Sequence, residues 1–105
     1  MLSLRLGGVL KRLREELSRI PGARAVIVFG SVARGDYRPD SDVDILLVVE
    51  DVERAKPLAR RISSNVFSET GVPVTVIVAS LDDYSSGRTA LLRRARREGR
   101  ALWRA

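Results

Sequence analysis

The sequence predicts an α/β (α+β) fold in which helices pack on a small mixed sheet of three to four strands. Two continuous apolar runs of strand length, residues 25–29 and 43–49, are typical of strands that are covered on both faces. Segments before and after these runs have apolar residues at helical spacing. A chain of 105 residues suits one domain with a modest core. Together these observations predict one layer of strands covered by helices.

The first expected helix spans residues 3–20 and is ended by Pro21-Gly22. The first strand, 25–29, follows it. A polar segment with a short helical turn after Ser31 then leads into the second strand, 43–49. The apolar residues of the first helix recur every three or four positions: Leu6, Val9, Leu10, Leu13, Leu17 and Ile20.

A second helix is expected over residues 53–69, with Pro57 in its first turn, where a missing N–H is tolerated. The third strand is expected at 72–78, followed by a short turn over 81–84 that Ser80 caps. A last helix is expected over 88–98, after which Leu102 and Trp103 fold back onto the core. The apolar faces of the two helices are formed by Ala55, Ala59, Ile62 and Val66, and by Leu91, Leu92 and Ala95.

The composition restricts the chemistry that is available. Cysteine and histidine are absent, so thiolate metal sites, disulfides and the commonest general base are excluded. Catalysis would have to use carboxylates, hydroxyls, arginines and backbone groups. No apolar stretch reaches 18 residues and the first residues lack the layout of a secretory signal, so we expect a cytoplasmic protein without a membrane segment.

The net charge of +6 is concentrated at the end of the sequence. Residues 88–105 hold seven arginines and one acid, Glu98, whereas the rest is balanced, with 12 basic and 12 acidic residues. Such a segment can attract RNA or an acidic protein surface, or it can be a solvated helix face. We expect the charges of Arg93, Arg94, Arg96 and Arg97 to contribute to binding such a partner. Because they lie in a different segment from any nucleotide site, we expect them to leave nucleotide binding nearly unchanged.

Asp42 and Asp44 stand one residue apart at the entrance of the second strand. Residues i and i+2 of a strand share a face, so the two carboxylates point the same way and repel each other. A divalent cation removes that repulsion, and Mg²⁺ is commonly held by carboxylates together with phosphate oxygens and water. The alternative is a solvated strand edge without a ligand.

Gly30 and Ser31 form the turn that follows the first strand. A glycine lets the backbone approach a ligand closely, and a helical turn beginning at Ser31 would direct N–H groups and a hydroxyl at an anion. If the two strand ends are neighbours, phosphate donors and a metal pair meet across a short gap. This arrangement suits phosphoryl or nucleotidyl transfer.

Gly30-Ser31, ten intervening residues and Asp42-Val43-Asp44 resemble the Gly-Ser…Asp-x-Asp signature of the DNA polymerase β-like nucleotidyltransferase superfamily. The string "FGSVARGDYRPDSDVDILLVV" is most similar to the minimal nucleotidyltransferases, the MNT proteins. The resemblance implies a single nucleotidyltransferase domain over residues 1–105. It also implies that Asp42 and Asp44 are catalytic and hold Mg²⁺, and that Gly30 and Ser31 contact the phosphates of ATP or another NTP. Arg34 is a further candidate phosphate ligand.

Active members of the superfamily usually bring a third carboxylate from the following strand. The alignment with that strand puts Thr75 at its position, and threonine cannot act as a base at neutral pH. Asp82, Asp83 and Glu69 remain candidates for the missing acid.

The resemblance further implies a partner, commonly a helical HEPN protein with which MNT proteins form toxin–antitoxin pairs. The expected function is that of the MNT antitoxin, transferring AMP to its partner. The alternative is a catalytically weak nucleotide-binding module that neutralises its partner by contact alone. Association into a homo-oligomer and RNA binding through the arginine-rich end are further expectations.

Overall fold

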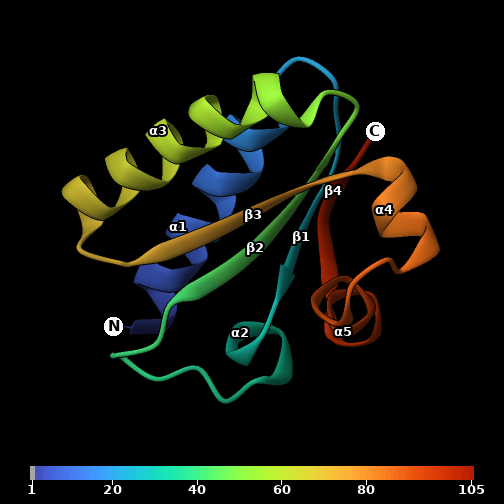
Figure 1. Ribbon diagram of the computed structural model, residues 1–105. Coiled ribbons are helices and arrows are strands. Elements are labelled where there is room, and N and C mark those ends of the chain that lie inside the picture. The colour runs from blue at the N-terminus through green and yellow to red at the C-terminus, as the bar shows by residue number, and fades with distance from the viewer. Residues whose placement is uncertain (1) are drawn as a thin grey trace.

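The computed structural model describes the backbone of residues 2–105 and the side chains from residue 5 onward (Figure 1). Helices and strands alternate along it as far as the third strand, after which two helices precede the last strand. In chain order the elements are α1 (Leu2–Ser18), β1 (Ala23–Phe29), α2 (Ser31–Arg34), β2 (Val43–Val49), α3 (Val52–Thr70), β3 (Val74–Ser80), α4 (Leu81–Ser86), α5 (Ala90–Glu98) and β4 (Arg100–Arg104).

The four strands form one mixed sheet in the order β3-β2-β1-β4. β1 is antiparallel to both β2 and β4, whereas β2 and β3 are parallel. In this register Phe29, the last residue of β1, lies opposite Asp44, and Asp44 lies beside Thr75 of β3. The end of β1 and the beginnings of β2 and β3 therefore meet at one edge of the sheet.

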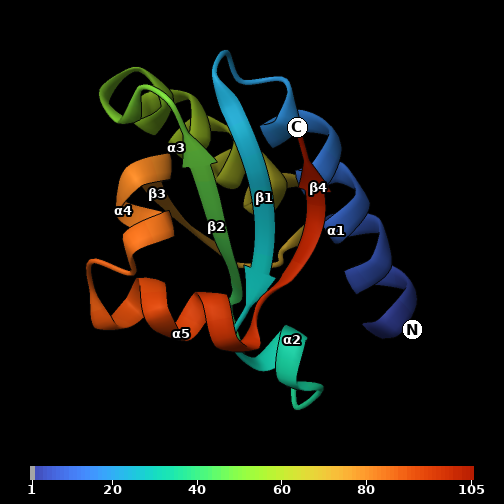
Figure 2. The same cartoon turned by 90° about the vertical axis from the view of Figure 1, so that its right-hand side faces the viewer.

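Helices cover both faces of this sheet, with α1 and α3 on one side and α4 and α5 on the other (Figures 1 and 2). Strand β2 is buried between the two layers, and its side chains alternate between them. Ile45 and Leu47 pack toward α1 and α3, while Leu46 and Val48 pack in the layer of α5. Asp44 lies two residues before Leu46 in the strand, so its side chain is on the same face, which is the α5 side of the sheet.

These observations confirm the predicted fold class and refine several boundaries. The second strand has the predicted bounds, but the first helix ends at Ser18 rather than at residue 20. The third strand begins two residues late because Pro73 has no N–H to donate; its carbonyl instead accepts the Val43 N–H at 2.9 Å. The fold-back of Leu102 and Trp103 is confirmed, since both lie in β4 and pack against the core.

Two predictions about the helices are wrong. Helix α3 begins at Val52, where the Asp51 side chain accepts the Arg54 N–H, so Pro57 lies beyond the first turn. Its ring removes the helical hydrogen bond to the Glu53 carbonyl. In α5, Leu92 and Ala95 are buried but Leu91 is 38% exposed, so Leu91 is not part of the core face.

No helix in the described part of the chain is long and apolar enough to span a bilayer.

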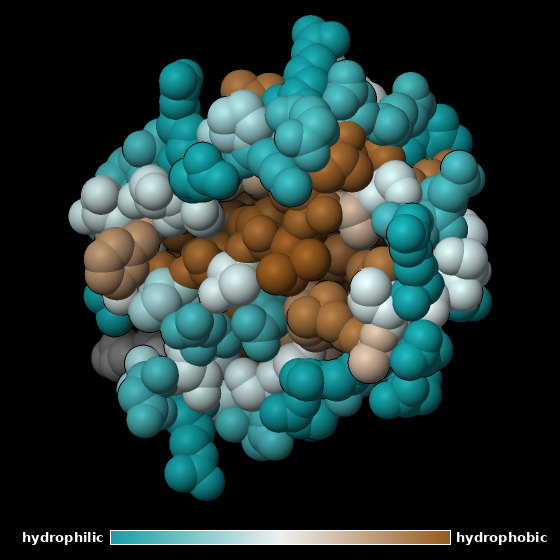
Figure 3. Space-filling model, in the orientation of Figure 1, coloured by the Kyte–Doolittle hydropathy of each residue, from teal (hydrophilic) through white to brown (hydrophobic). Residues whose placement is uncertain are grey.

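Strand β3 forms one edge of the sheet, and apolar side chains reach the surface around it. Figure 3 shows apolar residues gathered across this face, where β3 runs beneath α3. Phe67 of α3 is 54% exposed. Toward the C-terminal end of β3, a groove of 530 Å³ is lined by residues of β3, α3 and α5, among them Lys56, Ile77 and Leu91.

Candidate active site

The two aspartates predicted to form a metal site stand together at the start of β2. Asp42 immediately precedes the strand and is exposed, and Asp44 is its second residue and is partly buried. Burial raises the pKa of Asp44 above its ordinary value, and the Asp42 charge raises it further, while Arg94 and Arg34 act in the opposite direction. The two carboxylates, one residue apart at the start of β2, therefore repel each other.

Gly30 lies directly against Asp44. Its φ of 69° and ψ of −147° belong to a region that is essentially restricted to glycine. A Cβ at this position would overlap Oδ2 of Asp44 and stand 3.2 Å from its Cγ. The structure thus brings together the Gly-Ser turn and the aspartate pair, as the sequence predicts, and only glycine fits at their contact.

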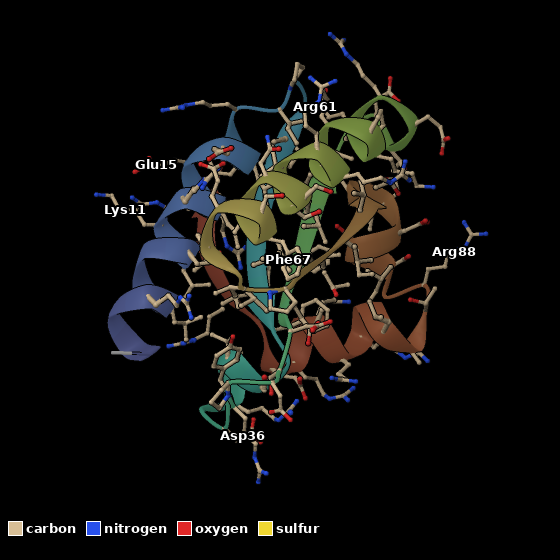
Figure 4. The ribbon with its side chains drawn as sticks, turned by 90° about the vertical axis from the view of Figure 1, so that its left-hand side faces the viewer. Lys11, Glu15, Asp36, Arg61, Phe67 and Arg88 are labelled. Carbon is tan, nitrogen blue, oxygen red and sulfur yellow. The ribbon has the colours of Figure 1, made fainter. Side chains whose placement is uncertain are left out.

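Ser31 and Arg34 begin and end α2, the short helix that follows Gly30. The Arg34 guanidinium donates to Asp36 at 3.4 Å and to Glu98 at 3.2 Å. Asp36 lies in the loop beyond α2, at the end of the molecule that carries the site (Figure 4). Asp36 is thus an ion-pair partner of Arg34.

Thr75 lies where the alignment with the superfamily places it. Its hydroxyl donates a hydrogen bond of 3.1 Å to Oδ2 of Asp42. Within residues 2–105 no group of three or more His, Cys, Asp and Glu side chains could hold a metal ion. In the described residues a threonine therefore stands where a third metal-binding carboxylate would be, and no third acid joins Asp42 and Asp44 in a metal-ligating group.

The other candidates for the third carboxylate lie elsewhere. β3 runs from Thr75, beside Asp44, to Ser80, beside Val49, so α4 and its two aspartates begin at the opposite end of the sheet. Asp83 pairs there with Arg88 at 3.2 Å, and Figure 4 shows Arg88 far from Asp36. Glu69 instead accepts a hydrogen bond of 2.8 Å from Arg12 of α1.

Two residues of α5 that we did not predict as site residues lie beside the aspartates. The charge of Arg94 lowers the pKa of Asp44. Glu98 accepts hydrogen bonds from Arg94 at 3.3 Å and from Arg34 at 3.2 Å. Figure 2 shows α5 passing alongside the end of β1, near the start of α2. The only local signal is the spacing of Arg94 and Glu98, one helical turn apart.

The expectation that the arginines of α5 lie away from the aspartate pair is therefore wrong for Arg94, whereas its effect on nucleotide binding stays a prediction. Two others have local structural contacts. Arg93 donates to the carbonyl of Gly87 at 2.9 Å, and Arg96 donates to the carbonyl of Ser85 at 3.0 Å. Both carbonyls lie at the C-terminal end of α4, where helical carbonyls lack intrahelical partners and attract cations.

Sequence comparison matches residues 10–96 to the nucleotidyltransferase domain family. A solved structure of a minimal nucleotidyltransferase is 31% identical, with a TM-score of 0.61, and the match covers 96% of this chain and 92% of that one. The chain therefore belongs to the nucleotidyltransferase domain family, within which its fold and sequence are those of the minimal type.

Two archaeal protein adenylyltransferases are also similar. The protein from Methanocaldococcus jannaschii is 40% identical over 50 residues, which are 46% of this chain and 50% of that protein. The MntA protein from Thermococcus cleftensis is 42% identical over 53 residues, which are 50% of this chain and 54% of that protein. The matched region thus spans about half the length of these relatives.

A complex between a tri-AMPylated HEPN toxin and an MNT antitoxin of Shewanella oneidensis contains the same fold. The match covers 100% of this chain and 74% of that chain, with a TM-score of 0.59 and 21% identity. At this identity the likeness concerns the fold.

Proposed function

We propose that this protein is an Mg²⁺-dependent nucleotidyltransferase that uses ATP and transfers AMP to a partner protein. The contact between Gly30 and Asp44 carries the proposal, because it places the Gly-Ser turn against the aspartate pair at one end of the sheet. Nucleotidyl transfer needs phosphate-binding groups and a cation site side by side, and these residues belong to a nucleotidyltransferase domain.

The donor set fits a magnesium ion. Asp42 and Asp44 are two carboxylates on one side of a strand end, and the pKa of Asp44 is raised by burial and by the charge of Asp42. Mg²⁺ is usually held by one or two carboxylates, with phosphate oxygens and water completing its octahedron. When bound, Mg²⁺ would supply positive charge against the phosphates and the two carboxylates.

The remaining residues would hold and orient the nucleotide. Gly30 and Ser31 are proposed to contact its phosphates, with Arg34 at the end of α2 as a further ligand. In the transfer step the hydroxyl oxygen of the acceptor forms a bond to the α-phosphorus. The bond from that phosphorus to the β-phosphate oxygen breaks, pyrophosphate leaves and the hydroxyl proton passes to water. Thr75 stands at the position of the superfamily's third acid and cannot accept that proton at neutral pH, so slow transfer is expected.

A HEPN-family protein is the proposed acceptor. Two observations support this choice: the similar archaeal proteins are protein adenylyltransferases, and the same fold occurs in an MNT antitoxin bound to an AMPylated HEPN toxin. The apolar surface around β3, with Phe67 half exposed, offers an area for partner contact. In this scheme the chain acts as the antitoxin of the pair.

Labelled ATP tests this function. The purified chain would be incubated with Mg²⁺, ATP labelled at the α-phosphate and a HEPN-family protein encoded beside its gene. Label should appear on the partner and be lost with Asp42→Asn or Asp44→Asn. Asp40→Asn is the matched control, because it removes the same charge from the loop that leads into β2. Equal labelling by all four proteins, or no labelling by any of them, would contradict the proposed transfer.

A further inference from the structure

Glu98 is the acidic residue of α5 that faces the site. Its Oε1 accepts hydrogen bonds from the guanidinium groups of both Arg34 and Arg94, at 3.2 and 3.3 Å. The Glu98 side chain is 23% exposed, compared with 43% for Arg34 and 47% for Arg94. One carboxylate thus joins two arginines from elements that are far apart in the sequence.

The stability of helix α5 does not explain why a glutamate occupies position 98. Glu98 is the last residue of the helix, where a negative charge is unfavourable with respect to the helix dipole. An arginine that precedes a glutamate by four residues is also the less favourable order for a helical ion pair. The partners outside α5, Arg34 and the Gly30 turn, account for its position.

The surroundings of Glu98 are those of an anion site. Burial raises the pKa of its carboxyl, but Arg94, Arg34 and the backbone N–H of Gly30 outweigh burial and hold that pKa below the ordinary range. Arg34 ends the short helix that follows Gly30, and Gly30 lies directly against Asp44. The donors around Glu98 therefore lie next to the proposed metal-binding pair, where the phosphates of a nucleotide are expected.

We propose that Arg94, together with Arg34, binds the triphosphate of the nucleotide, and that Glu98 holds both guanidinium groups until phosphate displaces it. The proposal rests on the proposed function, since it concerns the same nucleotide. A phosphate group and the Glu98 carboxylate repel each other and compete for the same donors. Phosphate is the stronger competitor, because it presents more charge and more acceptor oxygens to an arginine.

The roles proposed for Arg94 and Glu98 predict that replacing each residue changes the affinity for Mg·ATP in opposite directions. Arg94→Gln should weaken binding of Mg·ATP about tenfold or more, because a charge-assisted hydrogen bond is lost. Glu98→Gln should tighten binding of Mg·ATP by roughly two- to fivefold. In this variant the phosphate no longer has to break the ion pairs between Glu98 and the two arginines. If Glu98 only oriented the arginines, Glu98→Gln would weaken binding instead.

Calorimetric dissociation constants for Mg·ATP and for inorganic tripolyphosphate with Mg²⁺ test this. Arg96→Gln is the control for Arg94→Gln, since Arg96 lies on the same helix and bonds to Ser85. Glu50→Gln is the control for Glu98→Gln, since Glu50 pairs with Arg24 at 3.0 Å beyond the other end of β2. Thermal denaturation would verify that each variant is folded.

Weaker binding in Arg94→Gln and tighter binding in Glu98→Gln, with both controls unchanged, would support the proposal. Unchanged binding in Arg94→Gln, or unchanged or weaker binding in Glu98→Gln, would overturn it while leaving the proposed function intact. Tripolyphosphate binding with the predicted pattern but no ATP binding would uphold the anion site and refute the nucleotide function. A wild-type protein that binds neither ligand would refute both.

Discussion

The hydroxyl of Thr75 donates a 3.1 Å hydrogen bond to Asp42, one of the two proposed metal ligands. A residue at this position of β3 can therefore reach the aspartate pair directly. An acid here would stand close enough to share a cation or to accept a proton from an acceptor hydroxyl. Threonine does neither efficiently, although it gives Asp42 a fixed partner.

Replacing Thr75 by an acid should therefore raise catalysis. We expect Thr75→Asp to accelerate AMP transfer to the partner, within the ~10²–10⁴-fold that a general base typically contributes. Transfer of α-phosphate label, followed over time, measures the rate. Thr75→Val is the control, because it removes the hydroxyl without adding an acid, and it should not increase the rate. Rapid transfer by the wild type that Thr75→Asp fails to improve would refute the idea of an impaired base.

Gly30→Ala should destabilise the fold as well as the site. Its positive φ and the overlap of a Cβ with Asp44 both oppose a side chain, and a non-glycine residue in such a conformation costs about 1–3 kcal/mol. Urea denaturation gives the free energy of unfolding. Gly35→Ala is the control, since Gly35 has a φ of 85° but no atom within 4 Å of an added Cβ. A smaller loss in Gly30→Ala than in Gly35→Ala would contradict the close approach to Asp44.

Asp44→Asn should stabilise the metal-free protein at neutral pH. Burial first, and Asp42 second, raise the pKa of Asp44 in the folded state, so its ionised form opposes folding. The wild type loses stability relative to the variant as pH rises from the ordinary pKa of aspartate through this raised pKa. Below that window both side chains are neutral and the difference should vanish. Thermal denaturation in a chelator across this pH range is the measurement, and a variant less stable than wild type at neutral pH would contradict the prediction.

Arg93 and Arg96 should stabilise the junction between α4 and α5. Each donates to a carbonyl at the end of α4, and one such hydrogen bond contributes about 0.5–1.5 kcal/mol. We expect Arg93→Gln and Arg96→Gln each to lower the free energy of unfolding by about that amount, measured by denaturant unfolding. Arg97→Gln, which removes the same charge from the same helix, is the comparison. Equal losses in all three variants would indicate a general charge effect.

Local patterns predict much of the fold and half of the site. The apolar run at 43–49 has the bounds of β2, and the spacing of Asp42 and Asp44 places both carboxylates at its start. The Gly-Ser pair marks the turn that meets them. Each of these features depends on residues adjacent in sequence, whose geometry follows from strand alternation and glycine conformation.

The rest of the site depends on topology. Arg34 and Glu98 are 64 residues apart, and they meet because α5 covers the same face of the sheet toward which Asp44 points. Periodicity in α5 identifies Leu92 and Ala95 as buried, but it does not identify which face of which strand they cover. Likewise, Asp82 and Asp83 are close to Thr75 in sequence, yet β3 carries them to the opposite end of the sheet.

Calorimetric titration of ATP, with and without Mg²⁺, examines the aspartate pair most directly. Binding to the wild type should require Mg²⁺ and should be largely lost in Asp42→Asn, because the ion then loses one of its two proposed carboxylate ligands. Asp40→Asn, two residues earlier and carrying the same charge change, should bind as the wild type does. Equal affinity with and without Mg²⁺, or full binding by Asp42→Asn, would contradict a metal-dependent nucleotide site at these aspartates.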